Sequence, residues 1–377
     1  MFFRDIVGQE DFKKKILLEA RKGQVPHSLL FCGPEGVGKL LFAIAFARYL
    51  LCDNPSESDS CGTCRSCVKI NKLAHPDLHF VFPVIKKKRP LDKPVSDDYL
   101  TQWREVITTL HYFGLEEWLD HMGAENQQAM IYSEESESIA RKILLKSSEG
   151  GYKVMIIWLP EKMNRSCANK MLKLFEEPPD KTLFLLVSNH PELIIETILS
   201  RCQRVGIKQL DKKTISSALQ AYSYGLEKDK AEEIAHLSEG SWLEAIRTLR
   251  IEGSRDEFLD FFVSLTRLAY SRRLKEIKEL SDQIAGKGRE WQKSYLTYCQ
   301  RMIRENFVLN FRLPVLNAMT ANEKAFSSKF SPFINEGNVA DLMYELSEAQ
   351  SHIEQNVNAK MVFFDLSLKL IMLLKKK

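Results

Sequence analysis

The sequence predicts an α/β domain built on a buried parallel sheet, followed by a helical C-terminal part. Residues 28–32, 154–159 and 182–188 are near-continuous apolar runs, which are typical of strands covered on both faces. A glycine-rich turn follows the first run, and a helical pattern lies between the last two. From about residue 210 the pattern becomes helical, and only Pro314 and Pro332 interrupt it.

Further elements continue this alternation. Residues 40–51 combine apolar side chains with good helix formers, and 78–84 are rich in β-forming residues. Residues 169–177 have a helical pattern that ends at two prolines, and another helical stretch covers 191–199. The α/β domain is therefore expected to extend over 1–208.

Residues 86–128 interrupt the alternation. They are polar at first and then aromatic, and they predict a surface insertion that starts as a loop and continues as one or two helices. Further on, 211–249 predicts a small helical unit with a glycine turn at Gly240, and 256–377 predicts a bundle of longer helices. The large aromatic residues of the insertion are Trp103, Tyr112, Phe113 and Trp118.

Length and composition limit the classes of protein to which the chain can belong. Its 377 residues exceed one ordinary core, so two or three domains are expected. With 54 basic and 50 acidic residues the net charge is +4, which does not indicate a concentrated basic face for nucleic acid. No apolar run approaches a membrane span, and the N-terminus has no signal-peptide layout, so a cytoplasmic protein is expected.

The glycine-rich turn after the first strand reads GPEGVGKL. Between a strand and a helix this is the context of a P-loop, in which the backbone at Gly33, Gly36 and Gly38 surrounds phosphates and Lys39 reaches the outer ones. The next position should carry a hydroxyl that binds Mg²⁺, but it is Leu40. The alternative is a chance glycine turn; strand, spacing and helix favour a relic P-loop or one that only binds nucleotide.

The third buried strand lacks a feature that P-loop ATPases need. In those enzymes this strand ends in a carboxylate that holds Mg²⁺, often beside a second that activates water. Here the strand ends in Trp158 and Leu159, and Glu161 follows too late to replace the carboxylate.

Four cysteines lie within sixteen residues in the pattern C-x8-C-x2-C-x2-C. Thiolates at this spacing can hold one tetrahedral ion, and four of them complete its coordination, so a structural zinc is expected. Free or core cysteines are the alternative, but the segment between them is polar and offers little core. The expected ligands are Cys52, Cys61, Cys64 and Cys67, with His75 and His79 as rivals.

Two charged motifs lie beside predicted helix ends. Arg201 follows the stretch 191–199, and an arginine at a helix C-terminus is favoured by the helix dipole alone. Glu176 and Glu177 end another helix, where they oppose the dipole. They are either a tolerated exposed pair or a pair compensated by the cations of a partner.

In this order, the motifs resemble the bacterial clamp-loader ATPase family within the AAA+ proteins, which comprises the gamma/tau subunit of DNA polymerase III and its paralogue delta-prime. The resemblance covers roughly the first 250 residues, and the remainder matches only in being helical. The matching stretches are 6–9, 26–31, the P-loop, the cysteine module, 75–77, Asn169 with Leu172-Lys173, 175–179, 198–202 and Gly240-Ser241.

The departures from the family pattern favour the delta-prime type. The ATPase subunit carries a threonine, an aspartate-glutamate pair and a lid arginine where this chain has Leu40, Trp158 with Leu159, and Leu243. Arg201 is kept, and in the family this residue acts in trans, as an arginine finger on the γ-phosphate held by the next subunit. The resemblance therefore implies a subunit that does not hydrolyse ATP but completes a neighbour's site.

The resemblance also implies the architecture and the partners. We expect a RecA-like AAA+ domain at 1–208 with a zinc module at 52–67 and the insertion at 86–128, then an all-helical lid at 209–254 and an all-helical collar at 255–377. The partners would be gamma/tau and delta subunits in a hetero-oligomeric ring that places the sliding clamp on primer–template DNA. The chain would belong to the polymerase holoenzyme without ATPase or polymerase activity of its own, and ATP binding stays open.

Two other functions compete with this interpretation. One is an active gamma/tau-like ATPase, which the missing acid at the third strand opposes. The other is a zinc-dependent DNA-binding protein that works alone, which the near-neutral charge opposes.

Overall fold

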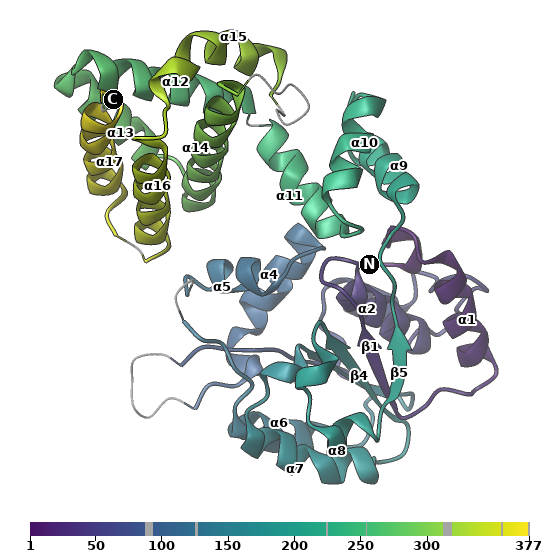
Figure 1. The fold of residues 1–377 in the computed structure, drawn as a ribbon. Helices are drawn as coiled ribbons and strands as arrows, with labels where there is room; N and C mark the ends of the chain where they lie inside the picture. Colours follow the sequence, from purple (N-terminus) through teal and green to yellow (C-terminus); the bar gives the residue numbers. More distant parts are fainter. Residues whose placement is uncertain are drawn as a thin grey trace. The chain divides into compact units, whose positions relative to one another are not determined.

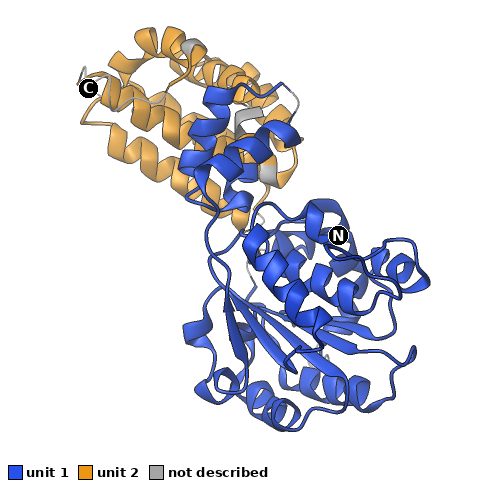
Figure 2. Cartoon of the chain, turned by 90° about the vertical axis from the view of Figure 1, so that its right-hand side faces the viewer, with its two compact units in different colours: residues 1–248 blue, residues 249–377 orange. Residues whose placement is uncertain are grey.

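The computed structural model describes residues 1–86, 93–124, 127–223, 225–253, 255–311, 319–355 and 357–375. The chain divides into two compact units, 1–248 and 249–377 (Figure 2). The finer division predicted from the sequence, with domains at 1–208, 209–254 and 255–377, stays a prediction.

A five-stranded parallel sheet forms the middle of the first unit (Figure 1). Its order is β2-β3-β4-β1-β5. The predicted parallel sheet is confirmed, and every residue of β3 and β4 is buried, as their apolar runs require. The strands are β1 (Ser28–Cys32), β2 (Leu78–Val81), β3 (Lys153–Trp158), β4 (Thr182–Ser188) and β5 (Gln203–Gly206).

Two strands differ from expectation. β2 ends at Val81 rather than at 84, because Pro83 cannot donate a ladder hydrogen bond and the N–H of Phe82 is bonded to Ser96 Oγ at 3.0 Å. β5 was not predicted, because this short edge strand is largely exposed and carries no apolar run.

Helices cover both faces of the sheet. Alternate strand residues point to opposite faces: Leu30 packs with the helices α6, α7 and α8, whereas Phe31 packs against Phe42 of α2. The helices of the first unit are α1 (Glu10–Arg21), α2 (Lys39–Leu50), α3 (Arg65–Asn71), α4 (Leu100–Leu110), α5 (Leu115–His121), α6 (Ser133–Leu144), α7 (Arg165–Glu176), α8 (Glu196–Leu199), α9 (Lys212–Tyr222), α10 (Lys228–Leu237) and α11 (Trp242–Gly253), which crosses into the second unit. Short 3₁₀ turns are η1 (Phe3–Asp5), η2 (Ser96–Tyr99), η3 (Pro160–Lys162) and η4 (Pro191–Leu193).

The insertion forms the two helices α4 and α5, whose polar residues are largely exposed while their large aromatic residues are buried. Trp103 and Trp118 are fully buried, and the Trp103 ring stacks on Phe82 with centroids 4.1 Å apart. Trp158, at the end of β3, packs against Trp103 at 5.2 Å. Large aromatic side chains are buried here because the sheet end offers an aromatic surface to cover. Part of the predicted opening loop, 87–92, lies outside the described residues.

The second unit is helical, as predicted. Its apolar side chains form one core that includes Phe262, Tyr295, Met302, Leu346 and Phe363. Its helices are α12 (Arg255–Ser271), α13 (Leu274–Ala285), α14 (Arg289–Leu309), α15 (Ala321–Phe330), α16 (Val339–Glu354) and α17 (Ala359–Leu373), with the 3₁₀ turn η6 (Ser331–Phe333).

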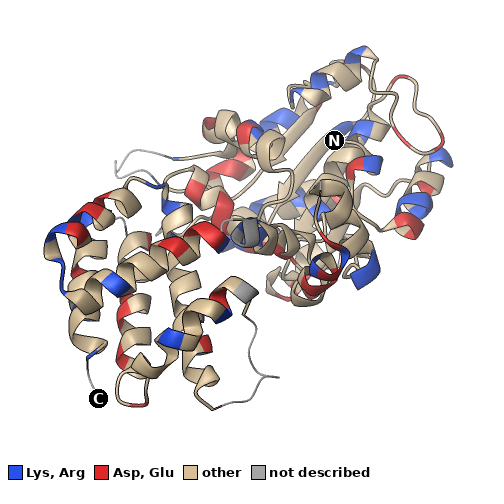
Figure 3. Ribbon diagram, turned by 90° about the horizontal axis from the view of Figure 1, so that it is seen from above, with Lys and Arg blue, Asp and Glu red and all other residues tan. Residues whose placement is uncertain are grey.

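Charge is distributed in the same way in both units. Lys and Arg are interspersed with Asp and Glu along the helices (Figure 3), in keeping with the near-zero balance of the sequence. In the part of the chain that the structure describes, no helix has the length and apolar character needed to cross a membrane.

Candidate functional site

The P-loop motif forms the turn that joins β1 to α2, at the carboxyl end of the sheet. Gly38 lies directly before α2 in the left-handed region, with φ of 89°. This position needs glycine for a second reason: a Cβ atom on Gly38 would lie 3.1 Å from the Tyr112 ring. The first N–H groups of α2 lie here, which is the place where a P-loop binds phosphate.

Lys39 is directed back to the loop that carries it. Its ammonium donates a hydrogen bond to the carbonyl oxygen of Gly33 at 2.7 Å and another to that of Pro34. The residue is 4% exposed, and burial lowers the pKa of Lys39 to about 8, although the carboxylates of Glu35 and Glu161 oppose the shift. The loop carbonyls therefore take the place of an outer phosphate as partners of Lys39.

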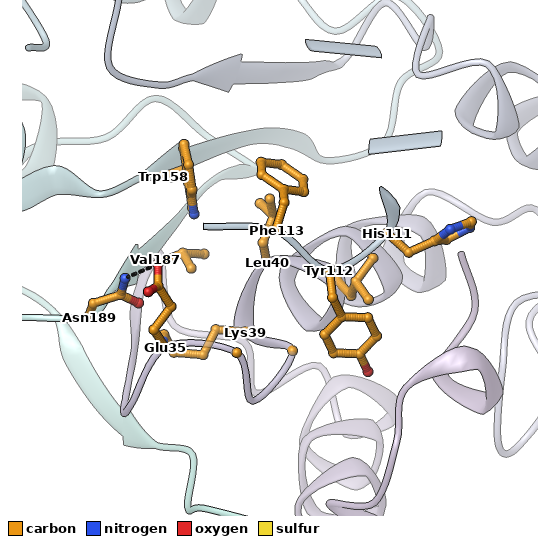
Figure 4. A pocket seen from close by; sticks show the side chains of 12 residues that line it. Glu35, Lys39, Leu40, His111, Tyr112, Phe113, Trp158, Val187 and Asn189 are labelled. Carbon is orange, nitrogen blue, oxygen red and sulfur yellow. Dashed lines mark hydrogen bonds between the residues drawn. The ribbon is translucent and has the colours of Figure 1, made fainter. Parts of the chain in front are cut away.

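The space above the P-loop is filled by apolar side chains (Figure 4). Leu40, Tyr112, Phe113 and Trp158 line a cavity of about 30 Å³. Sites for drug-sized ligands hold roughly 300–1,000 Å³, so this cavity is far smaller than such a site. Phe113 and Trp158 pack with centroids 5.4 Å apart. We call Tyr112, Phe113 and Trp158 the aromatic cluster.

Polar groups at the rim of this cavity bind one another. The Nδ2 group of Asn189, directly after β4, donates to Glu35 Oε1 at 3.4 Å (Figure 4). Oε1 of Glu161 accepts the backbone N–H groups of Asn189 at 2.9 Å and His190 at 3.2 Å. Glu161 therefore holds the turn after β4.

Helix α11 contacts both the P-loop and the insertion. The carbonyl oxygen of Gly36 accepts the N–H groups of Trp242 at 3.2 Å and Leu243 at 3.3 Å, at the start of α11. One turn later, Nε of Arg247 donates to Glu117 Oε1 at 2.6 Å. Glu117 belongs to α5, so the insertion is ion-paired with α11.

Arg201 lies at the other end of the sheet, between α8 and β5. Its side chain is 32% exposed, and its guanidinium donates to the carbonyl of Thr197 at 2.7 Å and forms an ion pair with Glu176. The two charged motifs that the sequence presents separately are thus one cluster. Glu176 is compensated by a cation of its own chain, an alternative that the sequence analysis did not include.

The four cysteines before and within α3 form one group. Their sulfur atoms all lie within 4.8 Å of one another, with Cys52 and Cys64 3.9 Å apart and Cys61 and Cys67 4.0 Å apart. Backbone N–H groups of Cys64 and Thr63 lower the pKa of Cys61 to about 6.

The rival ligand His75 is outside this group. Its Nε2 bonds Glu149 at 2.9 Å, and its Nδ1 accepts the N–H of Asp77.

Comparison with known proteins places the chain in a family. The sequence model of the family described as "DNA polymerase III, delta subunit" matches residues 8–211, more than half of the chain. The chain belongs to the DNA polymerase III delta-subunit family. The matched region of this delta-subunit family member holds the P-loop, the cysteine group, the insertion and Arg201, whereas the second unit lies outside it.

Curated relatives agree with the family. The chain is 29% identical over 239 residues to the DNA polymerase III subunit delta' of Pseudomonas aeruginosa, which covers 63% of this chain and 59% of that protein. It is 27% identical over 216 residues to subunit delta' of Bacillus subtilis, covering 57% and 50%. Subunit tau of Bacillus subtilis is 25% identical over 251 residues, covering 66% and 37%. The predicted resemblance to delta' and gamma/tau subunits is confirmed, and the chain spans three fifths or less of these relatives.

The site contains residues that the sequence analysis did not assign to it. Tyr112 and Phe113 were noted only as aromatic residues of the insertion, and Glu117, Asn189 and Arg247 were not noted. The available signal was a group of large aromatic residues in an otherwise polar segment, together with an unexpected Trp158 at a strand end. Neither observation places the two segments together without a fold.

Proposed function

We propose that this chain is a non-hydrolysing delta'-type subunit of the DNA polymerase III clamp loader, which lends Arg201 to the ATPase site of a neighbouring subunit. The observation that carries the proposal is the position of Arg201 relative to the chain's own P-loop. Arg201 precedes β5 and the P-loop follows β1, and these strands are parallel neighbours in which Leu29 pairs with Gln203. A five-residue strand spans about 16 Å, so Arg201 cannot serve its own P-loop.

Absence of hydrolysis follows from the chemistry of the P-loop. Leu40 offers no hydroxyl for Mg²⁺, and Trp158 stands where a metal-binding acid would be needed. Phosphoryl transfer depends on positioning and on the charge stabilisation that the metal supplies. Gly33, Gly36, Gly38 and Lys39 would form the remnant of the nucleotide site, and the small volume of the cavity beside them supports weak or absent nucleotide binding.

Arg201 suits a role in trans. A guanidinium keeps its charge and presents a rigid fork of donors to a phosphate. Its present partner, Glu176, is one exposed carboxylate, and exposed pairs contribute only about 0–1 kcal/mol. A phosphate held by a neighbouring subunit carries more negative charge and would replace Glu176.

The four cysteines fit a structural zinc ion. Zn–S bonds of about 2.3 Å place sulfur atoms about 3.8 Å apart in a tetrahedron, close to the separations of 3.9 and 4.0 Å in this group. Cys52, Cys61, Cys64 and Cys67 would complete the coordination and leave no position for substrate. The role of the ion is therefore to hold residues 52–67.

The expected partners are gamma/tau and delta subunits in a hetero-oligomeric ring, and through the ring the sliding clamp and primer–template DNA. The likeness to named delta' and tau subunits supports this part of the proposal. The helical residues 255–377 would form the collar that joins the subunits.

Reconstitution tests the proposed function. We expect the purified chain to co-purify with gamma/tau and delta subunits of the same organism and to be required for their DNA- and clamp-stimulated ATPase activity. The isolated chain should show no turnover. Turnover by the isolated chain that Lys39→Ala abolishes would identify an active ATPase instead, and a tight gel shift of DNA by the chain alone would favour the DNA-binding alternative.

A further inference from the structure

We propose that the insertion is a built-in occupant of the nucleotide site, which excludes nucleotide by means of Tyr112 and Phe113 and is itself fixed to helix α11 through Glu117. This inference goes beyond the proposed function and does not depend on it, because it concerns the chain by itself. It gives a role to a segment that the sequence analysis left without one.

The turn between α4 and α5 lies directly on the P-loop. A Cβ atom on Gly38 would be 3.1 Å from the Tyr112 ring, and one on Gly114 would be 2.4 Å from Glu35 Oε1. The first contact involves the residue that precedes α2, and the second involves a P-loop side chain. Backbone and side chains of the insertion therefore occupy the region that a bound phosphate chain would need.

The two aromatic residues are held in place from several sides. The Tyr112 hydroxyl accepts the N–H of Val7 at 3.0 Å, and its ring packs against Trp242 of α11 at 6.3 Å. Phe113 packs against Trp158 and Trp103 at 5.4 and 5.6 Å. Both residues are less than a tenth exposed. Contacts with η1–α1, β3, α4 and α11 make this a packed arrangement rather than a loop that rests on the surface.

Glu117 connects the insertion to α11 by a charged contact. One of its oxygens accepts the N–H of Gly114 at 2.8 Å, at the start of α5, and the other pairs with Arg247 at 2.6 Å. The Glu117 side chain is 19% exposed and that of Arg247 is 26% exposed. A charge-assisted contact of this kind therefore holds the insertion against α11.

The inference is tested with the purified full-length chain and ATP, by calorimetry with and without Mg²⁺. Wild type should show no saturable binding up to about 1 mM. The double variant Tyr112→Ala, Phe113→Ala should bind ATP with a Kd at least about tenfold below that limit. The Kd should be the same with and without Mg²⁺, because Leu40 offers the metal no ligand. Adding Lys39→Ala should abolish the gained binding, which assigns it to the P-loop.

Two controls keep the test decisive. Val106→Ala removes buried volume from α4 without altering the cavity lining, and it should bind no ATP. If it binds as well as the double variant, the specific role of the two rings is wrong. The second control measures hydrogen exchange of the wild-type protein, so it does not depend on whether a variant folds. Added ATP should leave the exchange rates of residues 33–40 and 110–118 unchanged. Protection of these residues by ATP, or a folded double variant that binds no ATP, would overturn the inference, whether or not the chain assembles with clamp-loader subunits.

Discussion

The two ends of the parallel sheet carry the two motifs of this chain, and they differ in exposure. At the carboxyl end, the P-loop is covered by the aromatic cluster, and Lys39 is 4% exposed. At the amino end of β5, Arg201 is 32% exposed and has one carboxylate partner. One site is closed by the chain's own side chains, whereas the other is open to another molecule.

The two ends therefore differ in the physical properties that the proposed function depends on. At the closed end, apolar side chains line the space beside the P-loop, and the charge of Lys39 is desolvated. At the open end, a charged group is held by an exchangeable contact on the surface. Both properties support the proposal that this chain completes a neighbour's site and does not use its own.

The largest effect is expected when variants at the two ends of the sheet are compared in the assembled complex. Arginine fingers are typically worth about 10³–10⁵ in rate, so Arg201→Ala should abolish turnover at the one site that this subunit completes. Total ATPase activity falls by that site's share, and clamp loading slows. Lys39→Ala, at the closed end, should leave both rates unchanged. Steady-state ATPase and clamp-loading assays measure this, and equal losses for the two variants would break the comparison.

Removal of zinc should have the next largest effect, and it should be local. Structural zinc contributes roughly 10–16 kcal/mol to the folding of small zinc peptides, so residues 52–67 should unfold without it. We expect one zinc per chain, lost when Cys61 and Cys64 are replaced by serine. Hydrogen exchange should increase within this module, while β1, β3 and β4 stay protected.

Metal analysis and exchange at the sheet check this expectation. Protein purified without chelator that contains no zinc would contradict it. Global unfolding of the serine variant would show that the cysteine module stabilises the sheet as well as its own residues.

A smaller, pH-dependent effect concerns the support of the insertion. Glu135 is 1% exposed, and burial raises its pKa to about 7. The hydrogen bond that it accepts from the Ser96 N–H at 2.6 Å opposes this shift. The charged or titratable groups near it are Lys142, Asp97 and the Cys167 thiol. The folded state therefore binds the proton more tightly than the unfolded state. The resulting stabilisation is complete below about pH 4.5 and is lost as the pH rises to about 7.

Glu135→Gln mimics the protonated form, so it should stabilise the protein at pH 8 by up to about 3 kcal/mol, and the gain should vanish below about pH 4.5. Urea unfolding at both pH values measures the difference. Glu137→Gln is the matched control, because Glu137 is on the same helix, exposed, and paired with Lys170 at 3.1 Å. It should change stability by no more than about 1 kcal/mol at either pH. A Glu135→Gln variant with no pH-dependent gain would mean that the carboxyl group is solvated.

At the carboxyl end of the sheet, the sequence predicts the individual strands but not which side chains pack over the P-loop. The strands 28–32 and 182–188 follow from apolar runs, because only a sheet covered on both faces tolerates them. The absence of Mg²⁺ ligands, which Leu40 and Trp158 predict, stays a prediction. The burial of Trp103 and Trp118 does not follow from the sequence, because aromatic residues of a polar segment pack inward only if a complementary surface exists, and Trp158 contributes to that surface across the fold.

The open end was predicted as two unrelated motifs. Glu176 and Arg201 are 25 residues apart, and neither helical periodicity nor capping rules relate them. They meet because α7 and α8 end beside each other at the amino end of the sheet. The edge strand β5, which fixes Arg201 next to β1, was also missed, because exposed short strands carry no hydrophobic pattern.

The smallest expected effect sharpens the comparison at its open end. If Glu176 is an exchangeable partner, Glu176→Gln should change the free energy of unfolding by less than about 1 kcal/mol, because the pair is exposed. It should also raise the ATPase activity of the assembled complex slightly, by less than about fivefold, since Arg201 no longer has to leave a carboxylate to reach a phosphate. If the variant instead loses activity as Arg201→Ala does, Glu176 orients the guanidinium and is part of the arginine's function. The two outcomes have opposite signs, so one titration of complex ATPase against ATP separates a competing carboxylate from a positioning one.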